Sequence, residues 1–69
     1  MNIPKEVFYQ KAQANGARVE YDHTGQYAIT EFPGEPKRLW HLGIDLAFLL
    51  VEGDEVEKWR EEFRIPRSG

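Results

Sequence analysis

Two histidines are the first residues whose chemistry could be catalytic or metal-binding. His23 lies in an Asp-His-Thr-Gly segment that is typical of a turn, and His41 lies between Trp40 and Leu42 in a strand-like segment. A zinc site would need a third ligand near both histidines, and the chain has no cysteine and no closely spaced histidine pair. We therefore expect no metal centre, with His23 solvated in a turn and His41 half-buried in a strand.

Nucleophiles and paired carboxylates give no stronger indication of catalysis. The only serine is Ser68, close to the end of the chain, and neither Thr24 nor Thr30 lies in the glycine-flanked pattern of a nucleophile elbow. Acidic residues cluster between Glu52 and Glu57, but a catalytic pair needs a cleft that raises one pKa. No glycine-rich phosphate loop is present. We expect that the protein is not an enzyme and that it binds no cofactor.

The first three elements that position these residues are a helix, a β-hairpin and a further strand. Pro4 followed by good helix formers predicts a helix over 4–14, which an Asn-Gly pair ends. Residues 17–32 alternate between apolar and polar types on both sides of the Asp-His-Thr-Gly turn, which predicts a hairpin. Residues 37–42 follow a second, proline-rich turn and predict a third strand.

The segment 45–64 carries apolar residues at helical spacing, and it admits two interpretations. It is either one helix with Gly53 on its inner face, or a short helix, a break at Gly53 and a second helix capped by Asp54. In both, Trp59 is expected in the core, and residues 65–69 form a frayed tail after the helix. The apolar positions of this stripe are Leu46, Leu49, Leu50, Val56, Trp59 and Phe63.

The predicted fold is a single small α+β domain, residues 1–69, with the order α-β-β-β-α. We expect a three-stranded antiparallel meander with both helices on one face. This order resembles that of the double-stranded RNA-binding domain, whose length is similar. That family grips phosphates with lysines at the start of its second helix, where this chain has Asp45 and no nearby lysine. The sequence therefore does not assign the chain to that family.

Charge and hydropathy argue against nucleic acid and membrane as partners. The formal net charge is −3, and the segment 45–62 carries seven acids against two bases. The longest apolar run, 46–51, is too short to cross a bilayer. Lys5 and Glu6 occupy the place where a signal peptide would need apolar residues, so we expect a cytoplasmic protein.

The function expected from these observations is protein–protein recognition. In the second and third predicted strands, apolar residues occur at both odd and even positions, so apolar side chains would point to both faces of the sheet. Two helices on one face would leave the apolar residues of the other face exposed. The predicted partner-binding residues on that face are Phe32, Arg38, Trp40 and Leu42. The partner is another protein or a second copy of the chain, and the protein is a small modulator or inhibitor of a larger complex, plausibly encoded by a phage or another mobile element.

Three alternatives to this interpretation stay open at the level of sequence. A bulge near Pro33 could change the face to which the following side chains point and so bring all the apolar strand residues into one core. The protein could act only as a subunit of an obligate assembly. It could also be a nucleic-acid-binding regulator, and the residues available for that role are Arg18, Lys37, Arg38 and Trp40.

Overall fold

The protein folds into a five-stranded antiparallel sheet with two helices, as described for residues 1–68 by a computed structural model. The spatial strand order is β1-β5-β4-β3-β2. This confirms the α+β class but corrects the expected three-stranded meander. The strands are β1 (Asn2–Pro4), β2 (Arg18–Tyr21), β3 (Tyr27–Glu31), β4 (Arg38–Leu42) and β5 (Leu46–Glu52), and the helical elements are α1 (Lys5–Ala12), η1 (Gly53–Glu55) and α2 (Val56–Trp59).

The first helix, the hairpin and the third predicted strand are confirmed as α1, β2–β3 and β4. The hairpin turn is held by one carboxylate. Asp22 Oδ1 accepts hydrogen bonds from the backbone N–H groups of Gln26 and Tyr27, and Thr24 Oγ1 donates to Asp22 Oδ2 at 2.7 Å. Gly25 has φ 74°, a conformation that a residue with a Cβ rarely adopts. The residue types of the turn thus fix the register of the hairpin.

The segment that was expected to begin a second helix is instead the longest strand, β5. It pairs with β4 on one side and with the short N-terminal strand β1 on the other. Both helical interpretations of residues 46–52 are therefore wrong, although the expected break at Gly53 and the second helix after it are present. A continuous apolar run of this length is consistent with a strand as well as with a helix.

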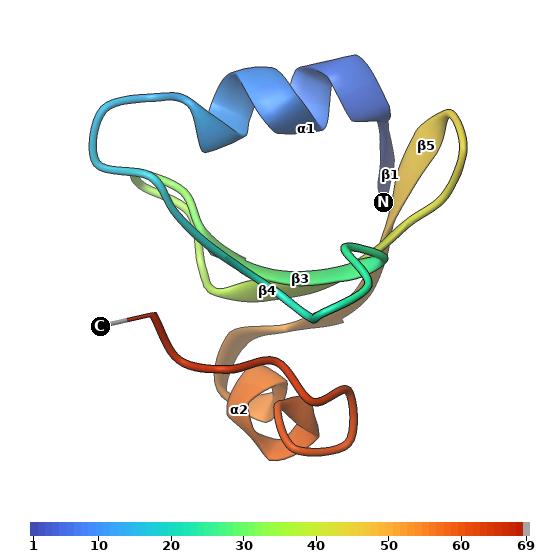
Figure 1. Ribbon diagram of the computed structural model, residues 1–69. Helices are drawn as coiled ribbons and strands as arrows, with labels where there is room; N and C mark the ends of the chain where they lie inside the picture. Colours follow the sequence, from blue (N-terminus) through green and yellow to red (C-terminus); the bar gives the residue numbers. More distant parts are fainter. Residues whose placement is uncertain (69) are drawn as a thin grey trace.

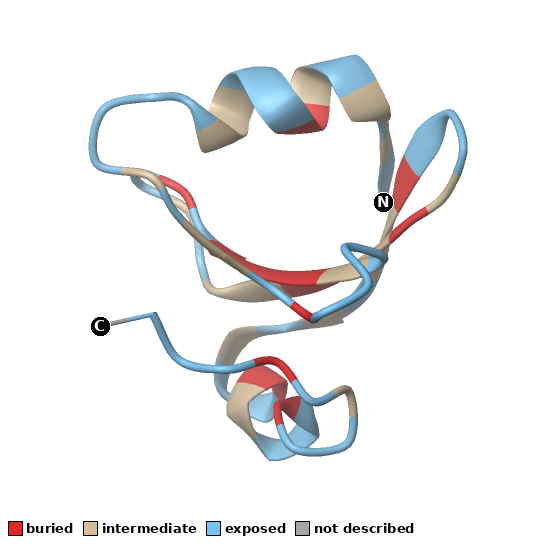
Figure 2. Ribbon diagram, viewed as in Figure 1, coloured by how far each residue is buried: buried red, intermediate tan, exposed pale blue. Residues whose placement is uncertain are grey.

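The two helices lie on opposite faces of the sheet, which corrects the expectation that both cover one face. Figure 1 shows α1 above the sheet and α2 below it. We call these the α1 face and the α2 face. Buried residues occur on both sides of the strands, as Figure 2 shows. This arrangement explains why apolar residues occur at both odd and even positions of β3 and β4. Alternate residues of the same strand enter two different cores.

The core on the α1 face is built around aromatic rings. Phe8 of α1 packs edge-to-face against Phe32 and Trp40, with ring centroids 5.9 and 5.6 Å apart. Trp40 is fully buried, and its indole N–H donates to Thr30 Oγ1 at 2.8 Å. This bond satisfies the one polar group that the indole brings into the core. The remaining buried members of this cluster are Ala28, Leu42 and Ala47.

The core on the α2 face joins the sheet to the C-terminal segment. Ile29 and Leu39 pack with Val56 of α2 and with Ile65 beyond it. Ile65, expected in a frayed tail, is 2% exposed, and Gly69 lies outside the described residues. Within residues 1–68, no helix is long and apolar enough to cross a membrane.

Candidate protein-binding surface

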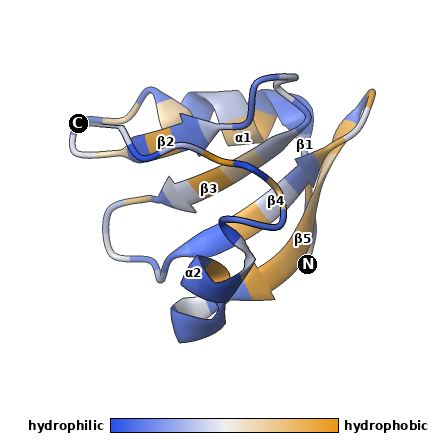
Figure 3. Ribbon diagram, turned by 60° about the horizontal axis from the view of Figure 1, so that its bottom comes forward, coloured by the Kyte–Doolittle hydropathy of each residue, from blue (hydrophilic) through white to orange (hydrophobic). Residues whose placement is uncertain are grey.

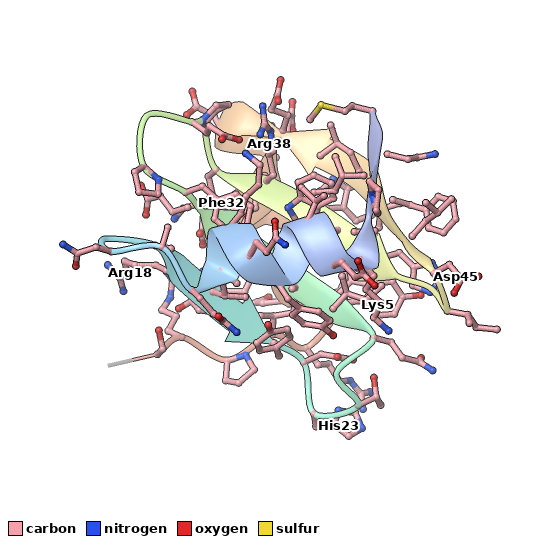
Figure 4. The ribbon with its side chains drawn as sticks, turned by 90° about the horizontal axis from the view of Figure 1, so that it is seen from above. Lys5, Arg18, His23, Phe32, Arg38 and Asp45 are labelled. Atoms are coloured by element: carbon pink, nitrogen blue, oxygen red, sulfur yellow. The ribbon has the colours of Figure 1, made fainter. Side chains whose placement is uncertain are left out.

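The four predicted partner-binding residues do not form an exposed patch. Phe32, Trp40 and Leu42 all belong to the core beneath α1. The side chain of Arg38 is 13% exposed and lies between Glu35 and Glu52, and Figure 4 shows it beside the sheet on the α1 side. The expected exposed aromatic face is therefore absent at these residues, because α1 covers the half of the sheet that was thought to be open.

The basic residues of the nucleic-acid alternative are not brought together on one surface. Arg38 lies toward the α1 face, whereas Arg18 and Lys37 line a polar cavity of about 250 Å³ on the α2 side, together with Arg60 and Arg67. Two of these bases are already paired with an acid: Glu57 accepts hydrogen bonds from Lys37 and Arg60 at 2.9 and 2.8 Å. Since Trp40 is buried in the opposite core, the four residues of this alternative make no common basic face.

An exposed apolar surface does exist, but it lies on the α2 face of β5. Leu46 and Phe48 follow this face of the strand, because Phe48 pairs with His41, while Ala47 packs into the α1 core. Leu50 lies two residues further along the strand, at an irregularity of the pairing with β4. Leu46 is 38% and Leu50 45% exposed. We call Leu46, Phe48 and Leu50 the β5 strip. In Figure 3, which turns the α2 side toward the viewer, the strongly apolar β5 extends beyond α2 and is left uncovered by it.

A bulge shapes one end of the β5 strip. Trp40 pairs with Leu49 while its neighbour Leu39 pairs with Val51, so Leu50 is an extra residue in β5 without an opposite partner in β4. A bulge bends the strand and increases its local twist. It also moves Val51 to the α2 face, where Val51 packs against the core that contains Leu39. The bulge therefore completes this core while leaving Leu50 exposed beside it.

Five aromatic side chains form a continuous row from α2 to the β5 strip. The ring-centroid distances along the row are 6.2 Å for Trp59–Phe63, 4.6 Å for Phe63–Tyr27, 4.9 Å for Tyr27–His41 and 6.1 Å for His41–Phe48. We call these residues the aromatic row. The three strand members are cross-strand neighbours, because Tyr27 pairs with His41 and His41 with Phe48. The row joins the exposed Trp59 to the exposed β5 strip.

Trp59 lies at the outer end of the row and was expected to be a core residue. It is 43% exposed, so that expectation is wrong. The helical face that points into the sheet carries Val56 and Arg60 instead. Because Trp59 is one residue away from Arg60 in a helical segment, its indole is directed sideways along the sheet rather than into it. Trp59 was expected in the core because the apolar residues of 45–64 have helical spacing, whereas Leu46–Glu52 form the strand β5.

Arg60 fixes the position of this helical segment through ion pairs that are mostly shielded from water. The side chain of Arg60 is 7% exposed and donates to Glu57, Glu20 and the carbonyl oxygen of Ile65. Hydrogen bonds from Arg60 and then Lys37 hold the pKa of Glu57 well below its usual range. The Glu57 and Glu20 carboxylates in turn raise the pKa of Arg60, so both groups stay charged. This network ties α2 to β2 and so supports the aromatic row.

The exposed acids Asp45 and Asp54 flank the β5 strip in sequence but do not lie together beside it. Asp45 lines a cavity with Lys5 and Tyr9 of α1, and Asp54 lines another with Lys37 and Glu57. Near the aromatic row, Lys58 is paired with Glu55 at 3.1 Å, and Glu62 and Arg64 are exposed on either side of Phe63. The charges around the row are therefore of both signs.

The residues first considered for catalysis are not gathered around a cleft. His23 is exposed in the hairpin loop, and Figure 4 shows it at the periphery of the molecule, away from Asp45. His41 is a member of the aromatic row. Within the described residues 1–68, no three histidine or acidic side chains are grouped as metal ligands.

Sequence reasoning missed the β5 strip, although its signal was present. The run of six apolar residues at 46–51 is consistent with a buried strand as well as with a helix. The helical spacing of Leu46, Leu49 and Leu50 competed with that signal. Comparison with known protein families, with curated proteins and with solved structures finds no match to this chain.

Proposed function

We propose that this chain is a non-enzymatic protein-binding module, a small modulator or inhibitor of a larger complex, that binds through its α2 face. The observation that carries the proposal is the aromatic row with the β5 strip, which joins exposed Trp59, Leu46 and Leu50 into one surface. Single exposed apolar residues are ordinary, but a connected apolar patch favours an interaction site. Tryptophan beside other aromatic rings is also typical of binding hot spots.

One edge of the sheet is a poor template for a further strand. β1 has only three residues and ends at Pro4, which has no N–H to donate. At the other edge, the backbone N–H of Ser68 donates to the side-chain carboxylate of Glu20, which lies opposite Ile29 of the α2 core, so the C-terminal segment lies over the α2 face of β2. Strand addition is thus disfavoured at β1, and we propose side-chain contact on the α2 face as the route of binding.

A comparative capture experiment tests the proposal. Three immobilised baits are used: the natural chain, the Leu46→Ser/Leu50→Ser variant and a Tyr9→Ser control. Tyr9 is 39% exposed, close to the exposure of Leu46, but it belongs to α1 on the opposite side of the sheet. Circular dichroism first verifies that all three baits are folded. We expect a protein from the source cells to be retained by the natural chain and the Tyr9 control and lost with the double variant.

Two outcomes would count against this function. Proteins that all three baits retain equally would show that the α2 face is not the binding surface. Selective loss with the Tyr9 variant would move the interface to α1. Since Leu46 and Leu50 are substantially exposed, their replacement by serine removes apolar contact area without opening a core cavity.

A further inference from the structure

The polar cavity on the α2 side is a second candidate site, and none of its lining residues belongs to the β5 strip. It has a volume of about 250 Å³ and lies between β2, β3 and the C-terminal segment, which passes below the sheet in Figure 1. We infer that this cavity binds a small oxyanion, a carboxylate or a phosphate group. This inference goes beyond the proposed function and does not rest on it.

The walls of the cavity carry more positive than negative charge. The charged residues that line it are Arg18, Glu20, Glu31 and Lys37 on the side of the sheet and Arg60 and Arg67 in the C-terminal segment. Within residues 1–68, Glu57 is the one further acid that pairs with these bases. Four bases therefore face three acids. The excess of positive charge disfavours a cation in the cavity, and the polar walls disfavour an apolar ligand.

The Glu57 carboxylate has no acceptor capacity left for the bases around it. A carboxylate offers about four acceptor sites on its two oxygens. Arg60 Nε and Arg67 Nη2 contact Oε1 of Glu57 at 2.8 and 3.0 Å. Lys37 Nζ and Arg60 Nη2 contact Oε2, both at 2.9 Å. Three bases thus share this one carboxylate, and of the three only Arg60 also pairs with Glu20 within residues 1–68.

Several N–H groups at the cavity have no acceptor within residues 1–68. Lys37 uses one of its three N–H groups, and Arg67 contacts an acid only through Nη2. In the same range, Arg18 forms no ion pair, although Glu31 lies opposite it in the register of β2 and β3. The planar donors of arginine match the oxygens of a carboxylate or a phosphate. An oxyanion in the cavity would therefore accept hydrogen bonds from both the sheet and the C-terminal segment.

The cavity combines a fixed wall with an open mouth. The side chain of Arg60 is 7% exposed and is held in place by its bonds to the two glutamates and to a backbone carbonyl. The side chain of Arg67 is 69% exposed, and Arg18 is also exposed, so a ligand can enter from solvent. At about 30 Å³ per water molecule, the volume equals that of roughly eight water molecules, which is ample for a carboxylate or phosphate group.

An NMR titration of the natural chain tests the inference. Inorganic phosphate and acetate are the probes, and sodium chloride at equal ionic strength is the control for screening. We expect saturable shifts of the Arg60 Nε–H and the Ser68 backbone N–H with a probe, and little response to chloride. Binding should weaken about tenfold or more in Arg18→Gln/Arg67→Gln, which removes two exposed bases of the cavity. Binding should stay unchanged in the matched control Arg64→Gln, because Arg64 is an exposed base of the same segment that does not line the cavity.

Tighter binding of acetate than of phosphate would assign the cavity to a carboxylate, and the reverse order would assign it to a phosphate; either order supports the inference. It is overturned if neither probe gives saturable shifts, if chloride has the same effect, or if the double variant binds as tightly as the Arg64 control. Circular dichroism verifies that each variant is folded, and Arg67→Gln alone replaces the double variant if that one unfolds. Since protein capture is tested at Leu46 and Leu50 instead, the inference and the proposed function can fail independently.

Discussion

At the scale of single residues, Arg64 stands out because it adopts a backbone conformation that suits glycine. Its φ is 53°, in the left-handed region. The surrounding hydrogen bonds explain why: the N–H of Ile65 donates to the carbonyl of Arg60, and the N–H of Arg64 to that of Glu61. This pair of bonds is the Schellman arrangement that ends a helix, with Arg64 at the position where glycine is preferred. The chain reversal brings Ile65 into the α2 core.

We predict that Arg64→Gly stabilises the protein. Arg64 is exposed and in the left-handed region, where a residue with a Cβ is disfavoured by about 1 kcal/mol or more. Relief of this strain should raise the melting temperature by roughly 4–8 °C for a domain of this size. Thermal unfolding followed by circular dichroism measures the change. Arg64→Ala is the matched control, because it removes the same side chain but keeps the strain, and an equal gain in both variants would contradict the explanation.

The two tryptophans show that residue type and local spacing do not determine which side chains are buried. Trp40 and Trp59 both occur among apolar neighbours, and the sequence predicted Trp40 at the surface and Trp59 in the core. The structure reverses both positions, with exposures of 0% and 43%. The side on which a residue is buried depends on which elements pack there. That information lies in contacts between distant segments, such as Phe8 against Trp40, and not in local spacing.

At the scale of elements, local sequence signals were sufficient to predict α1, the hairpin and β4, but they were not sufficient to predict β5. Turn residues such as Asp22 and Gly25 act within a few positions of one another, so the sequence predicts the hairpin well. In β5, the bulge at Leu50 interrupts the two-residue period and produces a spacing that imitates a helix. β1 has only three residues and gains its structure by pairing with β5. Neither feature can be recognised before the pairing is known.

The attachment of the α2 element to the sheet should depend on pH. Because hydrogen bonds from Arg60 and Lys37 lower the pKa of Glu57 in the folded state, the ionised carboxylate stabilises the native protein. This contribution is fully present above the pKa of the unfolded chain, about 4.3, and is lost as the pH falls toward the lower pKa of the folded state. We predict that Glu57→Gln destabilises the protein most at neutral pH and progressively less below about pH 4.3.

Urea unfolding at a series of pH values from neutral to acidic measures this difference. Glu62→Gln is the matched control, since Glu62 is an exposed acid of the same segment without an ion pair within residues 1–68. The control should follow the natural chain at each pH. A destabilisation by Glu57→Gln that stays constant into strongly acidic solution would show that packing, rather than charge, is responsible.

At the scale of the whole molecule, one sheet serves two cores at once. Adjacent residues of β3, Ala28 and Ile29, enter the α1 and α2 cores respectively, and in β4 the same is true of Trp40 and Leu39. Neither core can lose its packing without disturbing the strands that also line the other. Small domains of this kind usually unfold in one cooperative transition. The binding surface that we propose on the α2 face is therefore supported by the core on the opposite face.

We predict that the α1 core and the α2 core unfold together. The two tryptophans report on the two cores separately. Trp40 lies in the α1 core and Trp59 in the α2 segment, and the chain has no other tryptophan. Incorporation of fluorine-labelled tryptophan gives two NMR signals, which Trp59→Phe assigns. During urea titration, the folded signals of both residues should disappear with the same midpoint as the loss of circular dichroism. If the Trp59 signal disappears first, the α2 segment unfolds independently of the sheet, and the cooperative coupling of the two cores is wrong.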